Sequence, residues 1–221
     1  ARRLESHKEG RNAVLTEALF SMDGDLINTE GLQKLKSEYG FLCVVDEAHS
    51  FGALGDGGRG LARPVADIAV GTLGKAFGFF GAFVLMPEGF KEYLFNFSSP
   101  LIYSTTLPEA HAASALDILK LVGRSDDRRE NLRCVSARMR QGLRDEGFTV
   151  YGDAHVLAVE IGDEDRAVSV AKMMHGKSIF VFPARYPTVP LHRAILRISM
   201  TALHDENDVE RFIKSLKEVM N

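Results

Sequence analysis

The sequence contains no tryptophan, only two cysteines and no long apolar run among its 221 residues. Nothing in it approaches the roughly 18 apolar residues that cross a bilayer, and the charged start lacks the apolar core of a signal peptide. Cys43 and Cys134 lie far apart, and neither has a CxxC partner. We therefore expect a cytoplasmic protein without a transmembrane segment, in which both thiols are reduced and buried.

Neither sign of charge is in large excess. The 27 lysines and arginines face 30 aspartates and glutamates, which gives a net charge of −3 without a long basic run. Binding to nucleic acid or to an anionic membrane is therefore not expected. The seven histidines form no HxxxH or HExxH pair, so no metal site is expected either. The composition, 45% hydrophobic and 26% charged, is typical of a globular protein with one large domain and room for a smaller one.

Short apolar strands alternate with helices over residues 1–125. The run at 41–45 is continuous and ends at Asp46, which is typical of a parallel strand buried on both faces. Apolar residues recur at helical spacing up to Tyr39, and Gly40 suits the position just after a helix. This pattern predicts an α/β class with a mostly parallel sheet and helices on both of its faces. The strands are expected at 12–18, 41–45, 67–72 and 81–86, and the helices at 30–39 and 108–122.

The chain changes character after residue 125. A long, charged amphipathic helix at 126–145 is followed by a strand, a helix, two strands and a last helix. This order predicts a small α+β domain over residues 126–221. The strands are expected at 155–162, 178–182 and 195–200, and the helices at 165–175 and 205–219.

One glycine motif resembles a nucleotide-binding motif, but the sequence on either side of it does not fit such a site. Residues 55–60 match GxGxxG, the fingerprint of dinucleotide binding. That fingerprint requires a strand directly before it and a helix directly after it. Here the apolar strand ends well before Gly55, and Pro64 interrupts the segment after the motif, so we do not expect a dinucleotide site.

Two groups of polar residues lie just after neighbouring predicted strands. Asp46 and His49 come after the strand at 41–45, while Thr72 and Lys75 come after the strand at 67–72. Ligands of open α/β sheets bind outside the carboxyl ends of the strands, so both groups should face one crevice. A buried carboxylate beside a lysine is consistent with a structural ion pair. It is equally consistent with a Schiff-base lysine opposite an aspartate that pairs with a pyridinium nitrogen.

Five motifs in a fixed order give the sequence a family resemblance. Together they resemble the α-oxoamine synthases, which are pyridoxal-phosphate enzymes with the aspartate-aminotransferase fold, also called PLP-dependent transferase fold type I. This resemblance implies that residues 1–125 are the C-terminal part of the large, PLP-binding domain. The motifs are TEALFSMDGD (16–25), VDEAHSFGALG (45–55), GGRG (57–60), GTLGKAFG (71–78) and IYST (102–105).

The resemblance implies roles for the residues at the strand ends. Lys75 would form the Schiff base with pyridoxal 5'-phosphate and would move the α-proton of the substrate. Asp46 would pair with the pyridine nitrogen, and His49 would lie near the phenolic oxygen of the cofactor. Thr72 would contact the phosphate, and Ser21 would lie near the same oxygen region or near the substrate.

Three further residues are implied to act at the edge of this site. Ser104 and Thr105 match a motif that reaches the phosphate of the neighbouring subunit, which implies a homodimer. Arg197 matches the arginine that holds the carboxylate of the amino acid, because a planar guanidinium suits a planar carboxylate. Arg193 is a competing candidate for that carboxylate.

The reaction implied is the condensation of a small amino acid with an acyl thioester, either acyl-CoA or an acyl carrier protein, usually with loss of CO₂. The motifs are most similar to the 8-amino-7-oxononanoate synthase branch, which belongs to biotin biosynthesis. A serine palmitoyltransferase-like or glycine C-acetyltransferase-like activity stays open, as does a truncated, non-catalytic partner subunit. Family members are considerably longer, so we expect the chain to be part of a longer enzyme and to bind the cofactor poorly alone.

Overall fold

The computed structural model describes residues 2–6 and 11–220 and divides into two compact units. The first unit comprises Ala1–Ala18 and Ile27–Asp126, and the second comprises Leu19–Leu26 and Asp127–Asn221. The sequence pattern places residues 19–26 in the first part of the chain, whereas the structure groups them with the second unit. That segment is short and carries no periodic pattern from which this grouping could be read.

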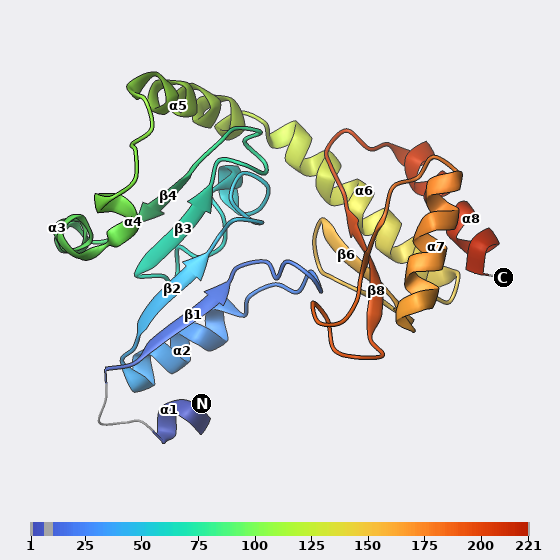
Figure 1. Cartoon of the computed structure of the whole chain (residues 1–221), viewed down its shortest axis with the longest axis horizontal. Coiled ribbons are helices and arrows are strands. Elements are labelled where there is room, and N and C mark those ends of the chain that lie inside the picture. The colour runs from blue at the N-terminus through green and yellow to red at the C-terminus, as the bar shows by residue number, and fades with distance from the viewer. Residues whose placement is uncertain (1, 7–10, 221) are drawn as a thin grey trace. The chain divides into compact units, whose positions relative to one another are not determined.

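A mixed sheet forms the centre of the first unit (Figure 1). Strands β1 (Ala13–Glu17), β2 (Leu42–Asp46) and β3 (Ile68–Thr72) are parallel, and β4 (Ala82–Leu85) is antiparallel to β3. The strand order β1-β2-β3-β4 agrees with the expected α/β class. Burial on both faces of β2 was expected and is wrong for one face, because Cys43 and Val45 are buried while Leu42 and Val44 are only half-buried.

Helices of the first unit begin and end at local signals. Helix α2 (Thr29–Tyr39) begins where the Asn28 side chain accepts a hydrogen bond from the Gly31 N–H, at 2.8 Å. It ends at Gly40, whose φ of 62° confirms the expected left-handed cap. Helices α3 and α4 were not expected from the sequence. The helices are α1 (Arg2–Glu5), α2, α3 (Glu88–Phe97), α4 (Ser99–Ile102) and α5 (Glu109–Gly123).

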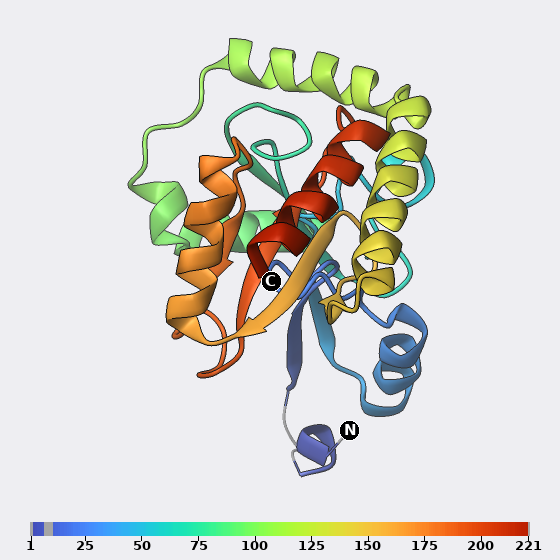
Figure 2. The same cartoon turned by 90° about the vertical axis from the view of Figure 1, so that its right-hand side faces the viewer.

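An antiparallel sheet with helices on one face forms the second unit. Leu143, Leu157 and Leu196 are fully buried between the sheet and the helices, which Figure 2 shows over one face of the sheet. The strand order is β5 (Val150–Tyr151), β6 (Val156–Gly162), β8 (Ala194–Ser199) and β7 (Phe182–Ala184). The helices are α6 (Asp126–Asp145), α7 (Glu164–Gly176) and α8 (Glu206–Met220).

Two expectations for the second unit need correction. A strand was expected at 178–182, but β7 begins only at Phe182, because the chain first turns away from α7 through Ser178 at a φ of 59°. Cys134 was expected to be buried, but it lies exposed on α6, whereas Cys43 is buried as expected.

The described part of the chain contains no helix long and apolar enough to cross a membrane and no cluster of metal-ligating side chains.

Residues 19–26 form a turn on the sheet of the second unit. Leu19 and Leu26 form an isolated antiparallel β-bridge, and the Asp153 N–H donates a hydrogen bond to the Gly24 carbonyl at 2.9 Å. A Cβ atom at Gly24 would overlap the Val156 carbonyl oxygen, and the φ of Gly24 is +74°. Only glycine therefore permits this close approach of two backbones.

Candidate active site

The carboxyl ends of β2 and β3 lie at the same edge of the first sheet. Asp46 is the last residue of β2, lies opposite Val70 of β3, and is exposed. Its Oδ1 atom accepts a hydrogen bond from the Ala48 N–H at 2.7 Å. This carboxylate was expected to be buried, and that expectation is wrong, because the side chain points away from the packed face that Val45 occupies.

The buried carboxylate belongs to the next residue, Glu47, which is only 4% exposed. It accepts hydrogen bonds from the Leu61 N–H at 2.8 Å, from the Ala62 N–H and from the Ser50 hydroxyl. A Cβ atom at Gly60 would collide with this carboxylate. Glu47 thus holds the loop after β2 in place. The features of the sequence that could have indicated this role are the acid next to Asp46 and the glycines at 57–60.

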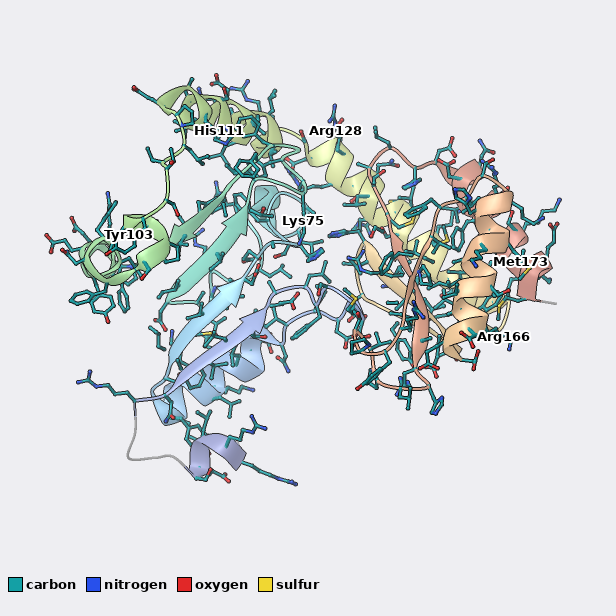
Figure 3. All side chains as sticks on the ribbon, viewed as in Figure 1. Lys75, Tyr103, His111, Arg128, Arg166 and Met173 are labelled. Carbon is teal, nitrogen blue, oxygen red and sulfur yellow. The ribbon has the colours of Figure 1, made fainter. Side chains whose placement is uncertain are left out.

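The loop after β3 carries Lys75 and is folded tightly on itself. The Thr72 hydroxyl donates to the Gly81 carbonyl at 3.3 Å and accepts from the Gly74 N–H at 3.0 Å. The Gly78 N–H closes a turn on the Lys75 carbonyl at 3.0 Å. Lys75 itself is exposed, in the loops at the carboxyl end of the sheet (Figure 3).

Aromatic rings join the loop of His49 to the loop of Lys75. Phe51 stacks on Phe77 with ring centroids 5.0 Å apart and an interplanar angle of 8°. Phe51 also packs edge-on against Phe83 of β4 at 4.9 Å. A Cβ atom at Gly52 would lie 2.8 Å from the Ala76 side chain, so the two loops touch closely. The structure therefore brings the Asp46 and Lys75 segments together, as their places at neighbouring strand ends predicted.

His111, which the sequence did not indicate as a site residue, packs against the loop that follows Lys75. Its ring stacks on Phe79 with centroids 4.0 Å apart, and its Nε2 atom is hydrogen-bonded to the Phe80 carbonyl. His111 comes from α5, so this helix supports the loop directly. No motif indicates this contact, because it depends on the path of the chain between β4 and α5.

Ser104 and Thr105 are not brought to Lys75 within this chain. Both are exposed and come after α4. Figure 3 shows the adjacent Tyr103 at the opposite end of the first sheet from Lys75.

Arg197 and Ser21 meet within the second unit. The Arg197 Nε–H donates to the Ser21 carbonyl at 2.5 Å, and Nη1 donates to the Ser199 hydroxyl at 2.6 Å. Burial lowers the pKa of the Arg197 guanidinium, because partial desolvation disfavours its charge. A carboxylate ligand would compensate for that lost hydration.

The competing Arg193 is exposed and already engaged by an acid. Its Nη2 atom lies 3.2 Å from the Tyr151 hydroxyl and 3.5 Å from Glu160 Oε2. The Tyr151 hydroxyl also donates to Glu160. This ion pair favours Arg197 over Arg193 as a carboxylate receptor, although both roles stay predictions.

Comparisons with known proteins place the chain in a family. The profile of the family described as aminotransferase class I and II matches residues 1–216. The chain belongs to this family. It is 40% identical over 216 residues to an 8-amino-7-oxononanoate synthase of Anaeromyxobacter dehalogenans, covering 95% of this chain and 54% of that protein. It is 39% identical over 213 residues to the same enzyme of Photobacterium profundum, covering 94% and 54%.

Solved structures agree with the fold. A serine palmitoyltransferase of Sphingomonas wittichii has a TM-score of 0.90 at 28% identity, covering 99% of this chain and 57% of that one. An 8-amino-7-oxononanoate synthase of Francisella tularensis has a TM-score of 0.85 at 28% identity, covering 98% and 65%. These matches confirm the resemblance to α-oxoamine synthases and the PLP-dependent transferase fold type I. The chain spans about half the length of the curated relatives it matches.

Proposed function

We propose that this chain belongs to a pyridoxal-phosphate-dependent acyltransferase that condenses a small amino acid with an acyl thioester and releases CO₂. An activity like that of 8-amino-7-oxononanoate synthase fits best, because the curated relatives bear that name. The observation that carries the proposal is the juxtaposition of the Asp46 and Lys75 loops, packed through Phe51 and Phe77 at the carboxyl edge of the sheet.

The side chains at this edge fit pyridoxal phosphate. The cofactor, when bound, supplies an electron sink for a carbanion, and it needs an acid partner, an amine and a phosphate-binding hydroxyl. Asp46 would hold the pyridine nitrogen protonated, and its exposure leaves it accessible to a ligand. Lys75 would hold the cofactor through its amine and would carry the substrate's α-proton. Thr72 would donate its hydroxyl to the phosphate, and His49 would contact the phenolic oxygen.

Other residues would recognise the substrate and complete the site. Arg197 would bind the carboxylate of the amino acid, with Ser21 beside it, because the guanidinium is half-buried and keeps donors available. Ser104 and Thr105 would serve the phosphate site of a second copy in a homodimer. The adjacent Tyr103 lies away from Lys75 within the first unit, which supports that arrangement (Figure 3). We place the protein in the cytoplasm, where thiols such as Cys43 and Cys134 stay reduced.

A serine palmitoyltransferase-like activity is the second candidate. It is favoured by the structural match to the Sphingomonas wittichii enzyme, whose TM-score is 0.90. A non-catalytic partner subunit would have no chemical need for a lysine at position 75. Release of free thiol from a series of acyl thioesters, with small amino acids as co-substrates, distinguishes the two activities by acyl-chain length.

The first experiment tests the cofactor site. The visible absorption spectrum of the purified chain is recorded with added pyridoxal phosphate, alongside Lys75→Ala and the matched control Lys172→Ala, which removes an exposed lysine of α7. Because the chain spans about half the length of its relatives and is expected to bind the cofactor poorly alone, the cofactor is added in large excess. We then expect a weak visible band in the parent and in Lys172→Ala that is lost in Lys75→Ala. A band that survives in Lys75→Ala contradicts the assignment of Lys75, and a band absent from the parent contradicts cofactor binding by this chain.

A further inference from the structure

We propose that Ser199 is a positioning residue that orients Arg197, so that one N–H edge of the guanidinium is presented to the substrate carboxylate. This inference rests on the proposed role of Arg197. The hydroxyl of Ser199 would act through the arginine and would not itself touch the substrate.

The register of β8 places the two side chains together. Arg197 and Ser199 are two residues apart on this strand, so they project from the same face of the sheet. Ile198 between them is only 7% exposed and packs into the core on the other face. The hydroxyl and the guanidinium therefore meet by local geometry alone, and the Nη1–Oγ distance is 2.6 Å.

A second anchor fixes the other side of the guanidinium. The Nε–H donates to the Ser21 carbonyl at 2.5 Å, and the turn at 19–26 is held to the sheet through Gly24. An anchor at Nε alone leaves the group free to tilt about that bond. Anchors at both Nε and Nη1 define its plane, which is a condition for two parallel bonds to a carboxylate.

The guanidinium of Arg197 keeps enough N–H donors to bind both oxygens of a carboxylate. A guanidinium has five N–H donors, of which Ser21 and Ser199 take one each. Over residues 2–6 and 11–220, the structure records no hydrogen bond from Nη2 and no ion pair of Arg197. The second Nη1 hydrogen and those on Nη2 can thus meet both oxygens of a carboxylate.

A ligand has room at this place. Arg197 and Ser199 both line an open groove of about 570 Å³ in the second unit, beside Phe182 and Met200. Arg193 does not line this groove, because Glu160 and Tyr151 hold it on another part of the surface. Of the two candidate arginines, Arg197 is therefore the one that lines the groove, together with Arg211 and Asp208.

Three serine variants and one arginine variant test the inference in the complete 221-residue chain. Ser199→Ala removes the hydroxyl, Ser199→Thr retains it, and Ser169→Ala removes an exposed hydroxyl of α7 as a matched control. Arg197→Ala removes the proposed receptor. The ¹H–¹⁵N signal of the Arg197 Nε–H is monitored by NMR while propionate is added, and this readout needs no cofactor. With pyridoxal phosphate added, L-alanine is titrated and its binding is measured by absorbance.

We expect Ser199→Ala to shift or broaden the Nε–H signal and to raise the Kd of either carboxylate about three- to tenfold, the usual effect of one lost hydrogen bond of ordinary strength. Ser199→Thr should restore both readouts, and Ser169→Ala should change neither. If Arg197→Ala weakens carboxylate binding but Ser199→Ala leaves the signal and Kd unchanged, the inference fails while the proposed function stands. If Arg197→Ala also leaves Kd unchanged, the proposed role of Arg197 fails together with the inference.

Discussion

Phe51 and Phe77 stack face to face across two loops that come after different strands, with ring centroids 5.0 Å apart. Phe51 lies two residues after His49, and Phe77 lies two residues after Lys75. This apolar contact therefore helps to set the relative position of the two loops that carry these polar side chains. A change in that contact should alter the site without touching any group that takes part in chemistry.

Phe77→Ala tests this coupling. Phe77 is 6% exposed, so its truncation should lower the free energy of unfolding of the first unit by about 3 kcal/mol. Cofactor binding should weaken as well, because the Lys75 loop loses its support. Urea unfolding monitored by far-UV circular dichroism measures the first effect, and absorbance with pyridoxal phosphate measures the second. Phe80→Ala, at a ring that is 73% exposed, is the control, and an equal loss in both variants would contradict the coupling.

Glu47→Gln should destabilise the first unit although it changes only one polar atom. The Glu47 carboxylate accepts from two backbone N–H groups and a hydroxyl, and a glutamine amide would turn a donor toward some of them. We expect a loss of about 2 kcal/mol in urea unfolding, typical of buried bonds to a charged acceptor. Asp56→Asn, at an exposed residue of the same loop, should change stability by less than about 0.5 kcal/mol.

The Lys36–Asp67 ion pair should make stability depend on pH. Burial would raise the pKa of Asp67, but hydrogen bonds from Lys36 and the Cys43 N–H, with the charge of Lys36, outweigh it and hold that pKa below its usual value. A carboxyl group with a lowered pKa stabilises the fold above its unfolded pKa of about 3.9, and this stabilisation is lost as pH falls through the folded pKa.

Urea unfolding of the parent and of Asp67→Asn measures that dependence. Since the pair is partly exposed, the variant should be less stable by at most about 1 kcal/mol at pH 7. The difference should shrink below about pH 4. A difference that stays constant between pH 7 and pH 3 would show that the charge of Asp67 does not contribute.

Tyr151 and Tyr39 should ionise at a higher pH than a tyrosine in solution, because the pKa of each is raised. The hydrogen bond to Glu160 raises the pKa of Tyr151, and the one to Glu38 raises the pKa of Tyr39 to about 12. Glu160→Gln should bring the pKa of Tyr151 down, whereas Arg193→Ala should raise it further, because the arginine charge lowers that pKa.

Phenolate absorbance measures these shifts cleanly, since the chain has five tyrosines and no tryptophan. The titration is best done in a Tyr39→Phe background, which removes the ionisation of Tyr39 from the curve. Tyr151→Phe should remove the late step of Tyr151. If both Glu160→Gln and Arg193→Ala move it in the same direction, the ion-pair geometry is wrong.

Much of the fold could be predicted from signals that lie within one segment. The bounds of α6 and the cap at Gly40 are examples, because an amphipathic period and a glycine are local features. Helix α3 could not be predicted, since it begins after Pro87 without a side-chain cap and contains Gly89 in its first turn. The strand expected at 178–182 failed because an apolar run alone does not show where the chain leaves a helix.

In the candidate site, too, features set by local sequence could be predicted, whereas features set by distant segments could not. Asp46 and Lys75 could be brought to one edge from the sequence, because parallel strands end on the same side of a sheet. The roles of Glu47 and His111 could not be predicted, since each depends on where a loop returns after many residues. The exposure of Asp46 was also missed, because the alternation along β2 places it opposite the buried side chains.

The turn at 19–26 has a consequence for the order of folding. More than half of the 221 residues lie between Gly24 and Val156, whose backbones pack against each other. Contacts between such distant segments form late, because a long loop must close first. A fragment that begins at residue 127 would lack segment 19–26, which packs on the sheet of the second unit. We expect this fragment to fold less stably than the same unit within the whole chain. During synthesis, segment 19–26 remains without its sheet until the second half of the chain has been made.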